Sequence, residues 1–308
     1  MVRSAPILIA GPTASGKSAL ALALAERIGG VVINADSMQV YRELRVLTAR
    51  PSFEDEARVP HALYGHVAAH DAYSAGRFVR DVREVLKDAE RQGRTPVIVG
   101  GTGLYFKALL EGLAPVPEID TAVRAYWREQ GTRVPASELH AILSSRDPVT
   151  AAKLSPSDTQ RVVRALEVLE STGRPLAEWQ IQKGVAVLDE AAVIKFAVRP
   201  ERAALYAEAD ARFASMVRAG AIDEVRALAN LGLDAAAPAL RALGVKPLLT
   251  FVEGRMSESQ AVAQGQLETR QYIKRQITWL DRNMITWKQI KTQLNNNNAN
   301  DIVSFIQS

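Results

Sequence analysis

The stretch Gly11-Pro12-Thr13-Ala14-Ser15-Gly16-Lys17-Ser18 decides the fold, because it has the G-x-x-x-x-G-K-S pattern of a phosphate-binding loop. The apolar run 7–10 precedes it and is short enough for a buried strand. Residues 19–28 are rich in Ala and Leu and are followed by Gly29, which is typical of a helix that ends at glycine. A plain glycine turn would also fit residues 11–18, but the strand expected before them and the helix expected after them favour a phosphate site.

Every position of this loop is a candidate contact for a phosphate group. The predicted contacts are Gly11, Pro12, Thr13, Ala14, Ser15, Gly16, Lys17 and Ser18. The glycines allow successive backbone N–H groups to point at one oxyanion, at the positive end of a helix. Lys17 adds a charge, and the Ser18 hydroxyl is a candidate metal ligand. We therefore expect Mg²⁺ as a cofactor, bound by Ser18 and bridging phosphate oxygens.

Composition restricts the class of protein. The chain has 308 residues, of which 47% are hydrophobic and 23% charged, as in an ordinary globular protein. It has no cysteine, which excludes a disulfide framework and a thiolate metal site. No run is as long as a membrane span, so we expect a soluble, cytoplasmic protein. The net charge of +4 permits a polyanionic partner without requiring one.

A second apolar run, 31–33, ends at Asn34-Ala-Asp36-Ser37. In a parallel sheet the carboxyl ends of neighbouring strands lie at one edge, beside the phosphate loop. Asp36 is therefore a candidate for chemistry. The alternative is that its carboxylate only caps a following helical turn.

A third strand is expected at 96–99, after a helix that Ser74 caps and that runs to Arg91. It leads into Gly100-Gly-Thr102-Gly-Leu-Tyr105. An ATPase or GTPase commonly has an aspartate after such a strand, to organise magnesium and water. Glycine stands there in this chain, which argues against a plain nucleotide hydrolase. Thr102 offers a hydroxyl at the same edge.

The order of predicted elements indicates an α/β fold, in which a parallel sheet flanked by helices is interrupted by an all-helical insertion. Prolines mark the boundary at 113–117, and residues 118–184 look wholly helical, with helices at 122–130, 137–143 and 157–172. We expect a discontinuous core, residues 1–117 and 185–292, and an insertion subdomain, 118–184. The third of these helices is predicted to begin with a Ser157-x-x-Gln160 capping box and to have a stripe of Val162, Leu166 and Leu169.

The last part of the chain is predicted to return to the core and then to end in a tail. A strand is expected at 193–198, helices at 201–219 and 222–231, and a long helix at 257–280. Around the end of that helix lie several basic residues, which suit a nucleic-acid partner or a solvated face equally well: Arg270, Lys274, Arg275, Arg282, Lys288 and Lys291. The asparagine run 295–298 lies in a low-complexity tail, 293–308, that we expect to be disordered.

His61, His66 and His70 lack a convincing spacing for a metal site.

Taken in order, these motifs resemble the tRNA dimethylallyltransferases, the bacterial family of tRNA prenyltransferases, over about residues 6–288. The resemblance rests on the phosphate loop, Asn34–Gln39, Thr48–Pro51, Tyr73–Ala75, Val99–Tyr105, Gln160–Val168 and Thr269–Trp279. The chain departs from the family pattern at Leu47, at Gly244-Val-Lys-Pro247 and after Trp279.

The resemblance implies a P-loop NTPase-like core and a definite reaction. A dimethylallyl group moves from dimethylallyl diphosphate to N6 of the adenosine 3′ of the anticodon, in tRNAs that read codons starting with U. By matching positions, Thr13, Lys17 and Arg212 act on the diphosphate, and Asp36 takes the N6 proton. The adenine has to leave its stack to reach these groups, as in other enzymes that modify a base.

The resemblance also implies a set of tRNA contacts, with the anticodon stem-loop as the partner. We expect the protein to act as a monomer. The matching residues are Asp36, Ser37, Met38, Gln39, Thr102, Arg124, Gln160, Arg161, Val162, Val163 and Arg164. Three other functions remain open from the residues alone. They are a small-molecule P-loop kinase, a prenyltransferase that modifies adenylate, and a non-enzymatic RNA-binding module.

Overall fold

The protein is described here as a computed structural model covering residues 5–295, 298–300 and 303. The chain forms two compact units. The core unit is Met1–Leu110 with Val187–Ser308, and the helical unit is Glu111–Ala186. The helical unit contains the stretch 118–184 that the sequence marks as an insertion. Within the described residues, no helix combines the length and the apolar composition needed to cross a bilayer.

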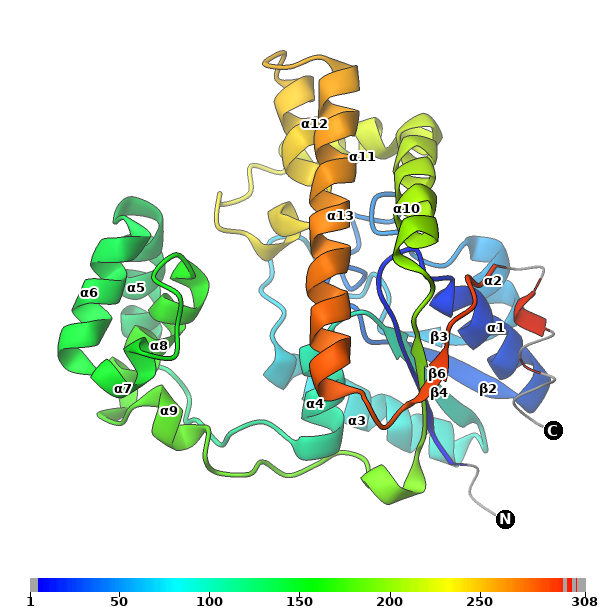
Figure 1. The fold of residues 1–308 in the computed structure, drawn as a ribbon, viewed down its shortest axis with the longest axis horizontal. Helices are drawn as coiled ribbons and strands as arrows, with labels where there is room; N and C mark the ends of the chain where they lie inside the picture. Colours follow the sequence, from blue (N-terminus) through cyan, green and yellow to red (C-terminus); the bar gives the residue numbers. More distant parts are fainter. Residues whose placement is uncertain (1–4, 296–297, 301–302, 304–308) are drawn as a thin grey trace. The chain divides into compact units, whose positions relative to one another are not determined.

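The core unit is built on one parallel sheet with the strand order β3-β2-β4-β1-β5-β6 (Figure 1). The strands are β1 (Ile7–Ala10), β2 (Gly30–Asn34), β3 (His61–Ala62), β4 (Thr95–Gly100), β5 (Ile194–Val198) and β6 (Lys288–Ile290). The four longest confirm the sequence-based strands. The prediction missed β3 and β6, because two or three residues carry no periodic signal.

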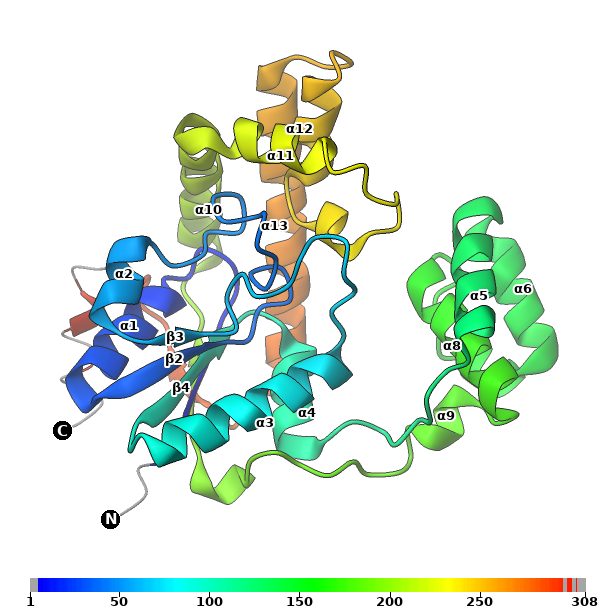
Figure 2. The same ribbon diagram turned by 180° about the vertical axis from the view of Figure 1, so that it is seen from behind.

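Helices cover both faces of the sheet, because the side chains of each buried strand alternate between them. Ile7 and Ile9 of β1 face the helix that follows the phosphate loop, α1 (Lys17–Ile28). Leu8 and Ala10 face the opposite layer. That layer consists of α3 (Ala75–Arg91), α4 (Gly103–Glu111) and the end of α13 (Glu258–Asn283) (Figure 2). Both sets of side chains are buried, and each large one, such as Leu8 or Ile9, stabilises the fold by roughly 1.5–3 kcal/mol.

Most of the remaining helices of the core unit form a third apolar cluster with the loop 40–47. These helices are α10 (Arg202–Met216), η2 (Val217–Ala221), α11 (Ile222–Ala229), η3 (Pro238–Arg241) and α12 (Val245–Val252). Two further short helices, α2 (Phe53–Arg58) and η1 (Glu190–Ala192), contribute no buried residue. Leu47 is buried in this cluster, and a Cβ on Gly244 would lie 3.1 Å from its side chain. The departures from the family pattern at Leu47 and Gly244 therefore fall on packing positions.

The helical unit consists of α5 (Thr121–Arg133), α6 (Ala136–Arg146), α7 (Pro148–Ala151), α8 (Thr159–Thr172) and α9 (Leu176–Trp179). Its core joins Trp127, Leu143 and Leu166 from three of these helices. The capping box expected from Ser157 to Gln160 is wrong. Asp158 caps α8 instead, and its carboxylate accepts a hydrogen bond from Arg161 N at 3.2 Å. Aspartate is as good an N-cap as serine, and it stands one residue closer to the helix.

The expected disorder of the tail is wrong for the part of it that the structure describes. Leu294, Ala299 and Val303 are buried in the apolar cluster of α1. Asn295 and Asn298 exchange two side chain–backbone hydrogen bonds, of 2.9 and 3.0 Å. The asparagines therefore cap a turn that returns apolar side chains to the core. Residues 296–297, 301–302 and 304–308 of the same prediction lie outside the described residues.

Candidate active site

The phosphate loop has the shape of an anion-binding cradle. Gly16 has φ +77° and Ala14 has φ +65°, so the backbone turns into the left-handed region on either side of Ser15. No side chain caps α1. Among the described groups, none accepts a hydrogen bond from the backbone N–H of Gly16, Lys17 or Ser18. Three unpaired donors at a helix N-terminus make a binding site for an oxyanion.

Lys17 supplies a cation whose charge is poorly stabilised without a ligand. Among the described residues, its ammonium group donates a hydrogen bond to Pro12 O alone, at 3.1 Å. Burial lowers the pKa of Lys17 from 10.5 to about 8, Asp36 opposes that change, and Arg212 reinforces it. An anion in the loop would satisfy the remaining donors of the ammonium and raise this pKa again.

Asp36 stands at the carboxyl end of β2, held by a short network of hydrogen bonds. The Asn34 side chain accepts from Asp36 N at 2.8 Å and donates to Asp36 O at 2.9 Å. The Asp36 Oδ1 atom accepts from Met38 N at 2.9 Å. The carboxylate thus caps a turn through one oxygen, and Oδ2 makes no hydrogen bond with the described residues. Asp36 therefore does cap a turn, as the alternative interpretation expected, but the cap uses one carboxylate oxygen and leaves the other available for chemistry.

The charge of Asp36 acts on groups from several separate segments. It raises the pKa of Lys17 and of Arg212 on α10, although burial is the largest influence on both and lowers both. It also contributes to the raised pKa values of Tyr105 and Tyr272, which burial dominates. The fold therefore places Lys17, Asp36 and Arg212, the three charged residues to which the family resemblance gives catalytic roles, within electrostatic range of one another.

Packing at the carboxyl end of β4 accounts for the missing aspartate. A Cβ on Gly100 would lie 2.1 Å from Ala35 O, and a Cβ on Gly103 would lie 2.4 Å from the Trp279 ring. Real side chains cannot approach so closely. The glycines are needed because Ala35, directly after β2, and Trp279 of α13 pack against this turn. An aspartate, which hydrolases have after this strand, would not fit there.

Gln276 is a residue of this site to which the sequence analysis gave no role. Its side chain is buried on α13, where Oε1 accepts from Thr13 N at 2.9 Å and Nε2 donates to Gly101 O at 3.1 Å. It thus ties the phosphate loop to the turn after β4. A signal was present, because Gln276 stands between Ile273 and Leu280 in a buried helical stripe, where an amide needs polar partners.

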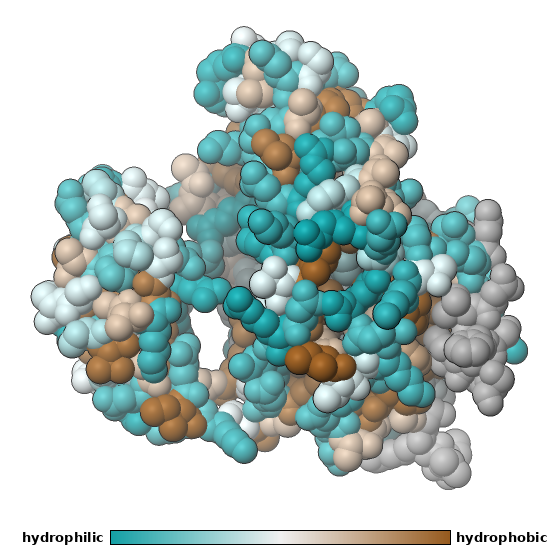
Figure 3. Space-filling model, viewed as in Figure 1, coloured by the Kyte–Doolittle hydropathy of each residue, from teal (hydrophilic) through white to brown (hydrophobic). Residues whose placement is uncertain are grey.

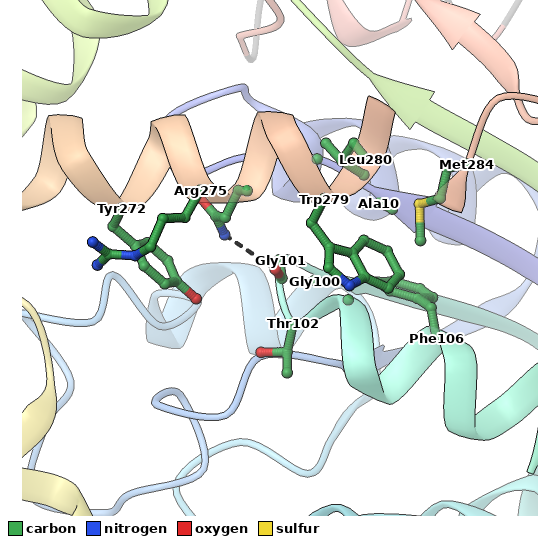
Figure 4. A pocket seen from close by; sticks show the side chains of 13 residues that line it. Ala10, Gly100, Gly101, Thr102, Phe106, Tyr272, Arg275, Trp279, Leu280 and Met284 are labelled. Carbon is green, nitrogen blue, oxygen red and sulfur yellow. Dashed lines mark hydrogen bonds between the residues drawn. The ribbon is translucent and has the colours of Figure 1, made fainter. Parts of the chain in front are cut away.

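A cavity of about 240 Å³ lies between α13 and the ends of β1 and β4 (Figure 4). One end is apolar, with Phe106, Trp279, Leu280 and Met284. The other end is polar, with Thr102, Tyr272, Arg275 and Gln276. Gly11 of the phosphate loop also lines it. A short apolar group joined to an anion would match this division.

Several predicted tRNA contacts make hydrogen bonds inside the core unit. Thr102 Oγ1 accepts from Ser37 N at 3.0 Å, which joins the ends of β4 and β2. The Gln39 side chain donates to Thr48 O and Ala49 O, each at 2.9 Å. Met38 is half-buried, and the expected metal ligand Ser18 is exposed. These bonds shape the edge of the site, whether or not the same residues touch RNA.

In the helical unit, the expected contacts divide by exposure. Gln160 and Arg161 are exposed and Arg164 and Arg124 are partly exposed, whereas Val162 and Val163 are buried in the core of the unit. Contacts with RNA through side chains therefore fall to the first four. Arg164 also pairs with the buried carboxylate of Glu167.

The basic end of α13 is only partly available to a ligand. Arg270 is bound to Asp210 through both carboxylate oxygens. Lys274 and Arg275 are exposed. The face of the core unit over α13 is mainly hydrophilic (Figure 3).

Fold and site together define a P-loop α/β protein that binds a phosphate-bearing ligand without the hydrolases' aspartate. Comparison with known proteins gives the class. Residues 39–283 match the family "IPP transferase", and residues 5–61 match "Isopentenyl transferase". The chain belongs to the IPP transferase family.

Its relatives share nearly the whole chain. The tRNA dimethylallyltransferase of Parvibaculum lavamentivorans is 52% identical over 97% of this chain and 95% of its own. That of Methylobacterium nodulans is 54% identical over 89% of this chain and 90% of its own. The tRNA isopentenylpyrophosphate transferase of Bacillus halodurans has a similar structure, with a TM-score of 0.69 and 30% identity over 99% of this chain and 96% of that one. A eukaryotic dimethylallyltransferase solved acting on tRNA has a TM-score of 0.72 and 26% identity, over 89% of this chain and 69% of that one.

Proposed function

We propose that this protein transfers a dimethylallyl group from dimethylallyl diphosphate to N6 of an adenosine in tRNA. The acceptor is the adenosine 3′ of the anticodon in tRNAs that read codons starting with U. The observation that carries the proposal is the meeting of Lys17, Asp36 and Arg212 at a phosphate loop that lacks a hydrolytic aspartate. A kinase of small molecules is less well supported, because the relatives in the comparison are named as transferases that modify tRNA.

In the proposed reaction one bond forms and one breaks at the first carbon of the dimethylallyl group. The adenine N6 attacks that carbon, and the carbon–oxygen bond to the diphosphate breaks. Negative charge develops on the leaving diphosphate, where Lys17, Arg212 and the loop amides stabilise it. Thr13 belongs to the same loop, and its backbone N–H donates to Gln276 Oε1. The proton of N6 passes to the free oxygen of Asp36.

The donor set is suited to Mg²⁺ bound mainly through the substrate. Among the described residues, no group of three His, Asp or Glu side chains could hold a metal ion. Mg²⁺ commonly takes one or two protein oxygens together with phosphate oxygens and water. We propose that the exposed Ser18 hydroxyl is the protein ligand. The ion would neutralise charge on the leaving diphosphate.

The proposed tRNA contacts extend from the core unit to the helical unit. Ser37, Met38, Gln39 and Thr102 border Asp36, and Gln160, Arg161, Arg164 and Arg124 lie on α8 and α5. The helical unit, 118–184 within Glu111–Ala186, is then the RNA-binding insertion. We propose that the protein acts as a monomer in the cytoplasm, where its RNA substrate is found.

One assay separates the candidate functions. The protein is incubated with labelled dimethylallyl diphosphate or with labelled ATP, and each is offered tRNA or AMP. Label from the prenyl donor in tRNA alone supports the proposal. Label in AMP identifies an adenylate prenyltransferase, label transferred from ATP identifies a kinase, and tRNA binding without transfer identifies a binding module.

A further inference from the structure

The segment that follows β6 packs directly against the phosphate loop. Gln293 Nε2 donates to Ala14 O at 2.7 Å, and Leu294 N donates to Ser15 O at 3.4 Å. A Cβ on Gly16 would lie 2.0 Å from Leu294 O, so the Leu294 peptide rests on the glycine itself. The match to the family model ends at residue 283, so the model itself does not include this segment.

The two hydrogen bonds reach the loop at its strained part. Ala14 adopts φ +65°, which costs free energy in a residue that has a Cβ. The carbonyl group of Ala14 is the one that receives the Gln293 amide. A bond made at this carbonyl stabilises the left-handed conformation on which the direction of the following amides depends.

The bonds leave the anion-binding side of the loop open. They are made to carbonyl oxygens, whereas an anion is bound by the N–H groups. In both hydrogen bonds Gln293 and Leu294 are the donors, so the backbone N–H groups of residues 16–18 take no part in them. The segment therefore braces the loop from outside and does not occupy the place of a phosphate.

The segment is itself anchored on both sides of these contacts. Leu294 is 3% exposed and packs in the apolar cluster of α1. Asn298 Nδ2 donates to Gln293 O at 2.9 Å. Upstream, β6 joins the sheet beside β5. An anchored brace can transmit its geometry to the loop, which a mobile tail could not.

We propose that Gln293 and Leu294 are positioning residues of the diphosphate site, holding residues 14–16 in the anion-binding conformation before the substrate arrives. The inference rests on the proposed function only for the identity of the anion. A loop that is already shaped loses less conformational entropy on binding, so the brace acts on affinity for the diphosphate. It does not act on the transfer step.

Gln293→Met tests this, because methionine keeps the length of the side chain and removes the donor. The matched control is Gln289→Met, the same exchange in β6 (Lys288–Ile290), just before this segment. Gln289 donates to Met284 O and Trp287 O, away from the loop. Inorganic pyrophosphate is titrated into each full-length protein by calorimetry. Amide hydrogen exchange is measured without ligand for Ser15, Ala19 and Leu20, whose N–H groups donate to carbonyl groups of the loop.

For Gln293→Met we expect the Kd of pyrophosphate to rise about three- to tenfold, the loss typical of one hydrogen bond. Exchange of these three amides should quicken, and the KM for dimethylallyl diphosphate should rise with kcat within about twofold. Gln289→Met should leave all of these unchanged. An unchanged Kd for Gln293→Met, or an equal rise in both variants, would overturn the inference. A wild-type protein that binds pyrophosphate but transfers no prenyl group would overturn only the proposed function.

Discussion

Replacing Asp36 by asparagine separates its two roles. In the structure one carboxylate oxygen accepts from Met38 N, and the other makes no hydrogen bond with the described residues. Asparagine keeps an acceptor oxygen for the turn, and it removes the base and the negative charge. The turn should therefore survive while proton acceptance is lost.

The expected size of the effect follows from these contacts. Losing a positioned general base slows proton transfer by about 10² to 10⁴, so single-turnover prenyl transfer should slow by that factor. The turn keeps its hydrogen bond, so the free energy of unfolding should fall by no more than about 1 kcal/mol. Loss of the Asp36 charge should also lower the pKa of Lys17 below its value of about 8. The assay is best run near pH 6.5 with saturating donor, where Lys17 stays protonated in both proteins.

The measurement is the single-turnover rate together with Tm on the same preparation. Asp55→Asn is a suitable control, because Asp55 takes part in the capping box of α2 and serves only the stability of that helix. If Asp36→Asn melts early and transfers at the wild-type rate, then the carboxylate is a turn cap and the assignment of a general base is wrong.

Other variants test the rest of the site. Affinity for dimethylallyl diphosphate should fall about tenfold per pH unit above about pH 8, because Lys17 loses its proton there. Lys17→Arg should flatten this pH dependence. The measurement is the KM for the donor across pH 6.5–9.5. Arg212→Ala should slow single-turnover transfer roughly a hundredfold at saturating donor, and an unchanged rate would remove it from the leaving-group site. Gln276→Leu should raise the KM for the donor and lower Tm, because Thr13 N and Gly101 O then lose their hydrogen-bond partner. Arg161→Ala should reduce the slope of log affinity for tRNA against log salt concentration by about one unit, and it should leave the KM for the donor unchanged. If affinity for tRNA and affinity for the donor fall equally, then Arg161 supports the fold.

Much of the site was predictable because its residues follow strands. The phosphate loop and Asp36 each come directly after an apolar run, and parallel strands place such residues at one edge. Gly100 was also informative, since its replacement of an aspartate argued against hydrolysis before the structure gave the steric reason. Periodicity and strand ends are local signals, and they were sufficient for these positions.

The parts that were missed depend on contacts between distant segments. Gln276 is part of the site only because α13 crosses the glycine turn after β4, and no local pattern reports that crossing. Gln293 stands beside an asparagine-rich stretch whose composition predicts disorder, yet neighbouring apolar residues return the chain to α1. The capping error at Ser157 has another cause, since two adjacent residues could both cap and geometry chose Asp158.

The charges of the site join its two chemical tasks. Burial lowers the pKa of both Lys17 and Arg212, and the charge of Asp36 opposes that change at both cations, together with Glu208 at Arg212. In the proposed reaction Asp36 accepts the proton of N6, and its negative charge disappears. Lys17 and Arg212 then act on the diphosphate without competition from Asp36, at the stage when the diphosphate gains its charge. Accepting the proton and stabilising the leaving group thus reinforce each other, because the same carboxylate competes with the diphosphate for the same two cations.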